Sequence, residues 1–237
     1  MRLDKLLANM GHGSRKDVKT LVKKKRVTVN DSLVKDSGMK IVPEKDMVKV
    51  DGTLVEYKPF IYLMMNKPPG YISATEDRHD KTVVDILSPD HQHYKPFPVG
   101  RLDKDTEGLL LLTNDGRLAH QLLSPKKDVE KTYYARISGI VTDKDVEAFA
   151  SGLTLDDGYE AKPAKLRIIS SGEQSEIEVV ITEGKFHQVK RMFEAVGKKV
   201  VYLKRLNMGE LTLDELLGLG EYRELNPEEL NYCQSIK

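Results

Sequence analysis

Apolar and polar residues near the start of the chain follow two different periods. Residues 2–9 and 18–22 each carry apolar side chains at helical spacing, so we predict two short amphipathic helices. Ser14 precedes the second pattern and Asp17 lies three residues further on, which is typical of a capping box. Residues 27–29 then alternate as a strand does. The pattern predicts a small unit of two helices followed by short strands.

Beyond residue 60, apolar residues come in short runs separated by turn residues. Four consecutive leucines at 109–112 predict a strand buried on both faces, and residues 114–116 (Asn-Asp-Gly) predict a turn after it. Other predicted strands lie at residues 61–65, 131–137, 166–169, 177–181 and 200–203, and predicted helices at 117–123, 142–149, 189–196 and from 226 onward. We therefore predict a second, larger unit that contains both strands and helices.

Charge is distributed unevenly, although the 237 residues sum to a formal net charge of +1. Residues 1–60 carry 14 basic and 8 acidic side chains, a net charge of +6. A basic module attached to a larger body is typical of polyanion binding, and a basic arm that only aids solubility is the alternative. The candidate docking residues are Arg2, Lys5, Arg15, Lys16, Lys19, Lys23, Lys24, Lys25 and Arg26.

Composition also argues against several classes of protein. No apolar run approaches the roughly 20 residues that span a bilayer, and the first residues lack the apolar core of a secretory signal. We therefore expect a cytoplasmic protein without a membrane partner. Cys233 is the only cysteine, which excludes an internal disulfide and argues against a cysteine-based metal site.

A polar loop precedes the four leucines and contains candidate chemistry. Gly100 and Gly108 bracket this loop, which carries Asp103 and Asp105. A carboxylate on a short loop anchored to a buried strand is held more rigidly than one on a free loop, which suits a catalytic group. Either aspartate could instead only cap the loop by accepting hydrogen bonds from backbone N–H groups. The residue pattern leaves both interpretations open.

The predicted helix at residues 189–196 has apolar side chains at i, i+3, i+4 and i+7. Lys190 and Arg191 lie beside this stripe. A solvated basic face is the ordinary interpretation of such residues.

Two sets of motifs carry a resemblance to known families. Residues 66–71 (Asn-Lys-Pro-Pro-Gly-Tyr), 100–103 (Gly-Arg-Leu-Asp), 130–133 (Glu-Lys-Thr-Tyr), 183–193 and 220–223 (Gly-Glu-Tyr-Arg) occur in this order. They resemble the motifs of pseudouridine synthases of the RsuA type, which isomerise uridine in bacterial small-subunit ribosomal RNA. Residues 1–55 resemble the S4 RNA-binding domain. The resemblance implies an α+β protein with an S4-like α/β domain at 1–57, a linker at 58–60 and a catalytic domain at 61–237. The catalytic domain would have the pseudouridine synthase fold, a mixed, mainly antiparallel β-sheet flanked by helices.

The resemblance also implies roles for individual residues. Asp103 would be the catalytic aspartate, Tyr133 would pack on the flipped base, and Lys190 would stand beside Asp103 where most branches of the superfamily have an arginine. Leu203 would line the uracil pocket, and Arg101 would help to hold the RNA with its base out of the stack. The residues expected to bind substrate are Arg101, Leu203, His187, Arg191 and Lys67.

The implied reaction breaks the N1–C1′ bond of uridine, turns the uracil and joins C5 to C1′. Nothing is oxidised, so no cofactor and no metal are expected. The base must leave its stack at a cost of a few kcal/mol, and an aromatic platform returns about 1–3 kcal/mol. Whether the aspartate attacks covalently or removes a proton stays open.

Three alternatives remain for the function. Residues 186–191 (Phe-His-Gln-Val-Lys-Arg) resemble the small-subunit type, which favours 16S ribosomal RNA, within a partly assembled subunit, as the partner of a monomer. A large-subunit (23S) target is the first alternative, and a non-catalytic RNA-binding assembly protein is the second. A glycoside hydrolase that pairs Asp103 with Asp105 or Glu107 is the third, but nothing in the loop sets two carboxyls at the spacing that such enzymes need.

Overall fold

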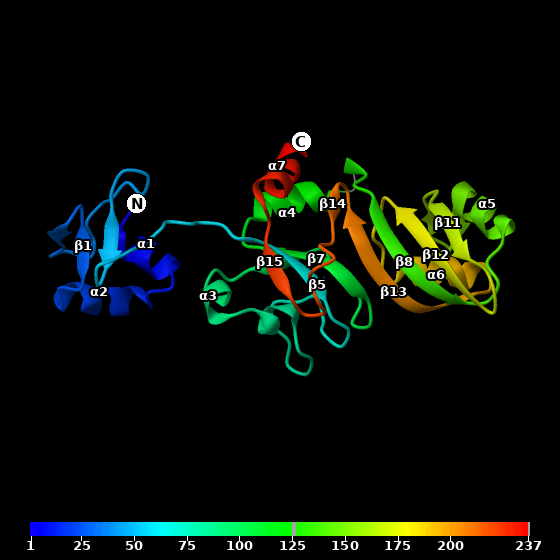
Figure 1. Cartoon of the computed structure of the whole chain (residues 1–237), viewed down its shortest axis with the longest axis horizontal. Helices are drawn as coiled ribbons and strands as arrows, with labels where there is room; N and C mark the ends of the chain where they lie inside the picture. Colours follow the sequence, from blue (N-terminus) through cyan, green and yellow to red (C-terminus); the bar gives the residue numbers. More distant parts are fainter. Residues whose placement is uncertain (125–126, 237) are drawn as a thin grey trace. The chain divides into compact units, whose positions relative to one another are not determined.

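The computed structural model describes residues 1–124 and 127–236, and the chain divides into two compact units. The N-terminal unit comprises Met1–Ile61 and Leu87–Pro96, and the C-terminal unit comprises Tyr62–Ile86 and the chain from Phe97 onward. Figure 1 follows the chain from its blue N-terminus to its red C-terminus. Each unit has an apolar core of its own.

Short helices and a small antiparallel sheet build the N-terminal unit. Its helices are α1 (Leu3–Asn9), α2 (Arg15–Lys23) and α3 (Pro89–Gln92). Its strands follow the order β2-β1-β3-β4, with bounds Ser32–Leu33, Val27–Val29, Val48–Val50 and Thr53–Leu54. The apolar stripes predicted for α1 and α2 form the core, where Leu7 and Val18 are fully buried.

The start of α2 confirms the predicted capping box. Ser14 Oγ accepts the N–H of Asp17 at 3.3 Å, and the Asp17 carboxylate accepts the N–H of Ser14 at 2.8 Å. These bonds satisfy two of the unpaired donors at the start of a helix. In the helix that follows, Lys16, Lys19 and Lys23 lie on one exposed face because they are three and four residues apart.

Among the described residues, nine strands form one sheet in the C-terminal unit. Seven follow the order β11-β12-β8-β13-β7-β5-β15, while β14 pairs with β13 and β6 pairs with β7. Among the described pairs, β7 and β13 run parallel and the others are antiparallel. The predicted α+β class with a mixed, mainly antiparallel sheet is therefore confirmed. The strand bounds are β5 Tyr62–Lys67, β6 Phe97–Val99, β7 Glu107–Thr113, β8 Lys131–Ser138, β11 Lys165–Ser170, β12 Gln174–Ile181, β13 Lys199–Met208, β14 Leu211–Thr212 and β15 Tyr222–Glu224.

Helices flank this sheet. They are a 3₁₀ turn η1 (Val83–Ile86), α4 (Gly116–Leu123), α5 (Asp143–Ser151), α6 (Gln188–Ala195) and α7 (Pro227–Ser235), and β9 (Leu153–Thr154) pairs with β10 (Glu160–Ala161) as a separate ribbon. Helices α4 and α7 contact each other, whereas α5 contacts β11 and α6 contacts β13 (Figure 1). The two ends of the sheet thus have different helical partners.

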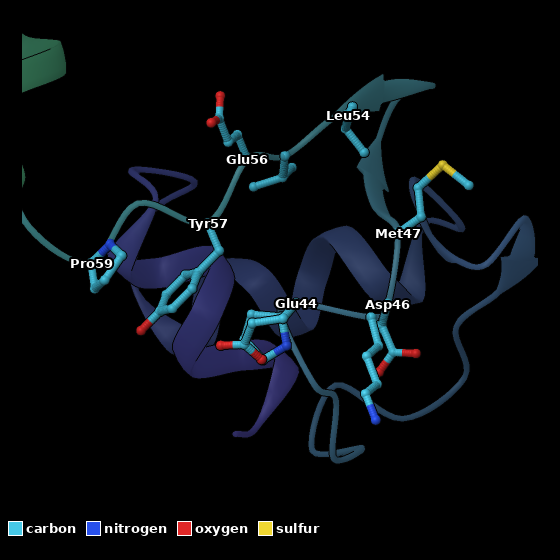
Figure 2. Close-up of a pocket in the computed structure, with 10 residues that line it drawn as sticks. Glu44, Asp46, Met47, Leu54, Glu56, Tyr57 and Pro59 are labelled. Carbon is cyan, nitrogen blue, oxygen red and sulfur yellow. The ribbon is translucent and has the colours of Figure 1, made fainter. Parts of the chain in front are cut away.

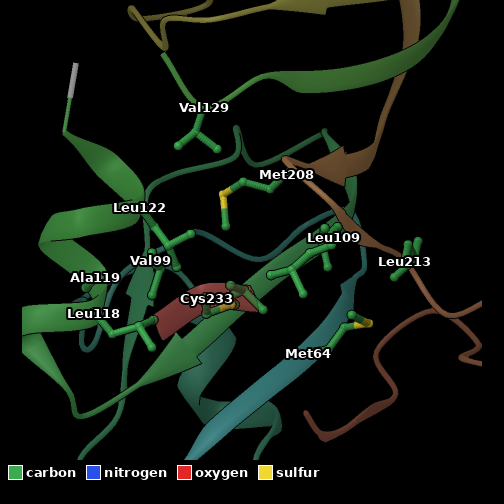
Figure 3. Close-up of a cluster of buried hydrophobic side chains, with 12 residues drawn as sticks. Met64, Val99, Leu109, Leu118, Ala119, Leu122, Val129, Met208, Leu213 and Cys233 are labelled. Atoms are coloured by element: carbon green, nitrogen blue, oxygen red, sulfur yellow. The ribbon is translucent and has the colours of Figure 1, made fainter. Parts of the chain in front are cut away.

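A large apolar cluster joins β5 and β7 to helices α4 and α7 (Figure 3). Met64 and Leu109 come from the sheet, Leu118 and Leu122 from α4, and Cys233 from α7. Burial raises the pKa of the Cys233 thiol to about 12, so the thiol stays protonated and packs as a small apolar group. This core anchors β5 and β7 next to the polar loop.

The chain turns directly after β7, as predicted for residues 114–116, and the same residues also begin a helix. Asp115 caps α4, because its carboxylate accepts the N–H groups of Arg117 at 3.0 Å and Leu118 at 3.3 Å. Aspartate suits both a turn and an N-cap, and the amphipathic pattern that follows decides between them.

Candidate active site

The loop between Gly100 and Gly108 is held from both sides by short hydrogen bonds. Ser73 Oγ donates to the carbonyl of Leu102 at 2.9 Å and accepts its N–H at 3.0 Å. Gly70 donates its N–H to the carbonyl of Lys104 at 2.7 Å. Asp103 therefore lies between two anchored residues, which limits how far its carboxylate can move.

Lys67 holds the same loop through hydrogen bonds to backbone carbonyls. Its side chain is fully buried at the end of β5. Lys67 Nζ donates to the carbonyls of Thr106 at 2.9 Å, Pro68 at 3.0 Å and Lys104 at 3.4 Å. Burial lowers the pKa of this lysine to about 8, against the opposing attraction of Asp105 and Asp103.

Asp103 and Lys190 form an ion pair at the surface of this loop. Lys190 lies in the first turn of α6, and its Nζ is 3.1 Å from Asp103 Oδ2. The same ammonium group lies 2.7 Å from Asp105 Oδ1, so it bridges two carboxylates. Burial alone would lower the pKa of Lys190, but its bonds to Asp105 and Asp103 outweigh burial and raise it. Lys190 is therefore a permanent cation at neutral pH. His187 Nε2 lies 3.6 Å from Asp103 Oδ1 on the other side.

A pocket of about 60 Å³ opens beside Asp103. One wall is the ring of Tyr133 from β8, and another is Leu203 from β13, while Arg101 and His187 line its rim. The neighbouring strands β8 and β13 bring Tyr133 and Leu203 to the same end of the sheet. Flat aromatic and apolar walls next to a carboxylate and a cation suit a planar, polar ring.

The structure brings together most of the residues that the sequence singled out. Five of these residues line the pocket: Asp103, Tyr133, Leu203, Arg101 and His187. Lys190 is connected to the pocket by its ion pair with Asp103.

Lys67 and Arg191 lie elsewhere. Lys67 donates hydrogen bonds to backbone carbonyls of the loop, such as that of Thr106. Arg191 forms ion pairs with Asp156 and with Asp157, and lies 2.6 Å from Asp157 Oδ1. These two side chains are not among the residues that line the pocket.

Asp105 is the residue whose place in the site the sequence does not predict. The sequence suggests a loop cap or a hydrolase carboxyl at this position, yet Asp105 shares Lys190 with Asp103. Burial opposes its ionisation, but the bond from Lys190 lowers the pKa of Asp105 below its usual value. Its position two residues after Asp103 could have indicated this place in the site. Side chains two residues apart can lie on the same side of a loop and contact the same partner, here Lys190.

The nine candidate docking residues of the N-terminal unit are all exposed. Arg2 and Arg26 are engaged in ion pairs with Asp4 and Asp51. The charged residues that line a hollow of about 500 Å³ in this unit are three carboxylates, Glu44, Asp46 and Glu56, and one lysine, Lys45 (Figure 2). This acidic hollow is unsuited to an anionic ligand.

Neither a metal cluster nor a membrane span occurs in the described part of the chain. No group of three or more His, Cys, Asp or Glu side chains among these residues could hold a metal ion. Within the same residues, no helix is both long and apolar enough to cross a membrane.

Comparisons with known proteins place the two parts of the chain in known families. Residues 61–195 match the RNA pseudouridylate synthase family, and residues 1–48 match the S4 domain. An uncharacterized RNA pseudouridine synthase of Bacillus subtilis is 53% identical over 98% of this chain and 97% of its own length. The ribosomal small subunit pseudouridine synthase A of Yersinia pestis is 41% identical over 97% of each chain. A pseudouridylate synthase crystal structure superposes with a TM-score of 0.69 at 34% identity, covering both chains fully. The chain therefore belongs to the RNA pseudouridylate synthase family, with an S4 domain at its N-terminus.

Proposed function

We propose that this protein isomerises one uridine of small-subunit (16S) ribosomal RNA to pseudouridine, with Asp103 as the catalytic residue. The observation that carries the proposal is the Asp103 carboxylate, 3.1 Å from Lys190, in a pocket walled by Tyr133 and Leu203. The ionised form of a carboxylate is favoured by a cation at this distance. The alternative role of Asp103 as a loop cap does not account for the lysine or for the pocket.

In this proposal, the RNA presents a flipped uridine and the uracil ring packs against Tyr133. The N1–C1′ bond breaks, the uracil turns within the pocket, and C5 bonds to C1′, after which the proton on C5 is lost and N1 gains one. Asp103 acts on the sugar or the base at this step, either as a nucleophile or as a base. Lys190 stays paired with it at 3.1 Å and supplies a positive charge beside it. The reaction is redox-neutral and loses no group, so atoms and charge balance within the nucleoside.

Base flipping requires more free energy than stacking on one ring supplies. Extruding the base costs a few kcal/mol, and packing on Tyr133 returns about 1–3 kcal/mol. The remaining free energy that extrusion requires must come from contacts elsewhere on the RNA. The exposed basic residues of α1, α2 and the turn after α2 supply these contacts in our proposal.

The proposed domain assignment separates RNA docking from the reaction in the same way. We propose that residues 1–57 dock on RNA as an S4-like domain, that 58–60 link the domains, and that 61–237 carry out the reaction. A cytoplasmic monomer acting on a partly assembled small subunit is the simplest form of this proposal. It rests on relatives named for the small ribosomal subunit that align along nearly the whole chain.

Asp103→Asn tests the catalytic assignment. We expect no pseudouridine formation on small-subunit RNA, with RNA affinity within severalfold of the parent. The matched control is Asp105→Asn, two residues away on the same lysine, which should stay active because Lys190 keeps Asp103 as a partner. Full loss in Asp105→Asn together with activity in Asp103→Asn would reverse the assignment.

Mapping pseudouridine in both ribosomal RNAs of a deletion strain tests the substrate. We expect one mark to disappear from the small-subunit RNA. A mark that disappears from the large-subunit RNA would assign that substrate instead. If the purified protein makes no pseudouridine on any precursor RNA but binds RNA, the protein is a non-catalytic RNA-binding factor. Release of free uracil would point to hydrolysis of the glycosidic bond.

A further inference from the structure

A second hollow, of about 300 Å³, adjoins the pocket beside Asp103. The two share Arg101, Tyr133, Gly184 and Lys185 as lining residues, so the ring of Tyr133 is a common wall. Lys131 and Arg205 also line the second hollow, from the neighbouring strands β8 and β13. The sequence motifs assign no role to this hollow, to Lys131 or to Arg205.

Arg205 is a buried cation with unused donors. The residue is only 3% exposed. Nε donates to the carbonyl of Leu109 at 2.8 Å, but the buried Nη2 has no hydrogen-bond partner in the part of the chain that the structure describes. A guanidinium nitrogen left unpaired in the interior is unfavourable, because its desolvation is not offset by a hydrogen bond. Such a group indicates a missing acceptor.

Lys131 is a second buried cation next to it. Its Nζ donates to the carbonyls of Val129 at 2.7 Å and Thr182 at 3.3 Å, which leaves one of its three protons free for another acceptor. Burial, and then the nearby charge of Arg205, lower the pKa of Lys131. Two cations are thus held together against their mutual repulsion.

The hollow has little negative charge to balance them. Of its described lining residues, only Glu183 carries a carboxylate, and its oxygens already accept from Tyr159 Oη, the Lys162 N–H and Gln188 Nε2 at 2.6–2.9 Å. No ion pair joins Lys131 or Arg205 to a carboxylate among the described residues. The charge of this hollow is complementary to an anion that arrives with a ligand.

We infer that this hollow binds a phosphodiester of the RNA backbone next to the flipped uridine, with Arg205 and Lys131 donating to its non-bridging oxygens. The inference rests on the proposed function, because the shared wall of Tyr133 places this phosphate beside the base in the adjoining pocket. A guanidinium suits phosphate because its planar fork matches two oxygens, and buried charged hydrogen bonds are stronger than exposed ones. The phosphate contact would fix the backbone while the base leaves the stack.

Salt dependence of RNA binding tests this inference. Arg205→Gln is compared with the control Lys165→Gln, which removes an exposed lysine of β11 that pairs with Glu130. Both substitutions are made in the Asp103→Asn background so that no turnover occurs. The affinity of each variant for a small-subunit RNA transcript is then measured over a series of salt concentrations. We expect Arg205→Gln to weaken binding about tenfold and to lower the slope of log affinity against log salt by about 0.7–0.9, which corresponds to one phosphate. Lys165→Gln should leave both within a factor of two. An unchanged slope in a folded Arg205→Gln protein would overturn the inference.

A second measurement starts from the unmodified protein and needs no RNA. Sulfate has the tetrahedral shape and the negative charge of a phosphate group, so we expect millimolar sulfate at constant ionic strength to raise the thermal midpoint of the protein. Lys131→Met, like Arg205→Gln, should abolish the rise. No rise in the unmodified protein overturns the inference. A rise combined with unchanged RNA binding in both variants indicates a site for free anions only and also overturns it.

The outcome is separable from that of the proposed function. If the unmodified protein makes no pseudouridine yet Arg205→Gln lowers the salt slope, the function fails and the phosphate site stands. If pseudouridine forms normally and the slope does not change, the function stands and the phosphate site fails.

Discussion

Two lysines on opposite sides of the Asp103 loop have opposite pKa shifts. Burial lowers the pKa of Lys67 to about 8, because only backbone carbonyls receive its protons. Lys190 is also partly buried, but two carboxylates reverse the effect of burial and raise its pKa. The lysine bonded to carbonyls supports the loop, whereas the lysine bonded to carboxylates places a positive charge beside Asp103.

Lys67→Met should therefore change the pH dependence of stability. The pKa of Lys67 is near 8 in the folded protein and 10.5 in its unfolded reference, so between these values the unfolded chain binds one more proton. The free energy of unfolding of the parent must rise across this window relative to the variant, by roughly 3 kcal/mol at 1.36 kcal/mol per pKa unit. Below pH 8 the difference should be constant.

Denaturant titrations of the two proteins at pH 7, 8, 9 and 10.5 measure this change. Taking the difference removes the other groups that titrate in both proteins. A difference that stays flat from pH 7 to 10.5 would show that Lys67 keeps an ordinary pKa in the fold.

At the scale of elements, the site depends on one parallel strand pair. Strands β7 and β13 run side by side with Arg205 opposite Gly108, at the point where the Asp103 loop enters β7. Gly108 has a φ of +101°, and a Cβ there would collide with the backbone carbonyl oxygen of Arg205. Glycine is required here both by conformation and by the close approach of the neighbouring strand.

Gly108→Ala should lower the free energy of unfolding by at least about 2 kcal/mol, because strain and collision act together. Gly116→Ala is the matched control at the first position of α4, where a Cβ meets no atom within 4 Å and the backbone is helical. Alanine favours a helix over glycine, so the control should be neutral or stabilising by up to about 1 kcal/mol. Urea denaturation measures the free energy of unfolding of the two variants. Equal values for both would contradict the role of Gly108.

At the scale of the whole molecule, charge and chemistry lie in different units. Residues 1–60, with their net charge of +6, belong to the N-terminal unit, while the pocket is built from the C-terminal unit. RNA affinity and the rate of the chemical step should then respond to different substitutions.

Replacing Lys16, Lys19 and Lys23 of α2 by glutamine should lower the slope of log affinity against log salt by about 0.7–0.9 for each phosphate that these lysines neutralise. The single-turnover rate at saturating RNA should remain within severalfold of the parent, because none of these side chains lines the pocket. The control replaces Lys144, Lys165 and Lys199, three exposed lysines of the C-terminal unit, with the same change of net charge. An equal fall in slope for both triple variants would show that RNA binding has no preference for α2.

Local sequence is sufficient where a single element decides its own structure. The capping box of α2, the buried leucine strand β7 and the amphipathic stripe of α6 are predictable because each pattern lies within a few consecutive residues. Strands β6, β14 and β15 are only two or three residues long, and pairing with other strands of the sheet forms them. No local pattern could reveal these strands.

By itself, the sequence determined the helices of seven residues or more, the long strands, the charge of the N-terminal unit, and, through its motifs, the family and the candidate residue Asp103. Those features depend on side-chain spacing along the chain, which the sequence contains in full. The tertiary structure alone decided that Lys190 also bonds to Asp105, that Lys67 holds the loop through its backbone carbonyls, and that Lys131 and Arg205 line one hollow. These arrangements join residues 37 to 87 positions apart or depend on the register of neighbouring strands, and only the folded sheet brings such residues together.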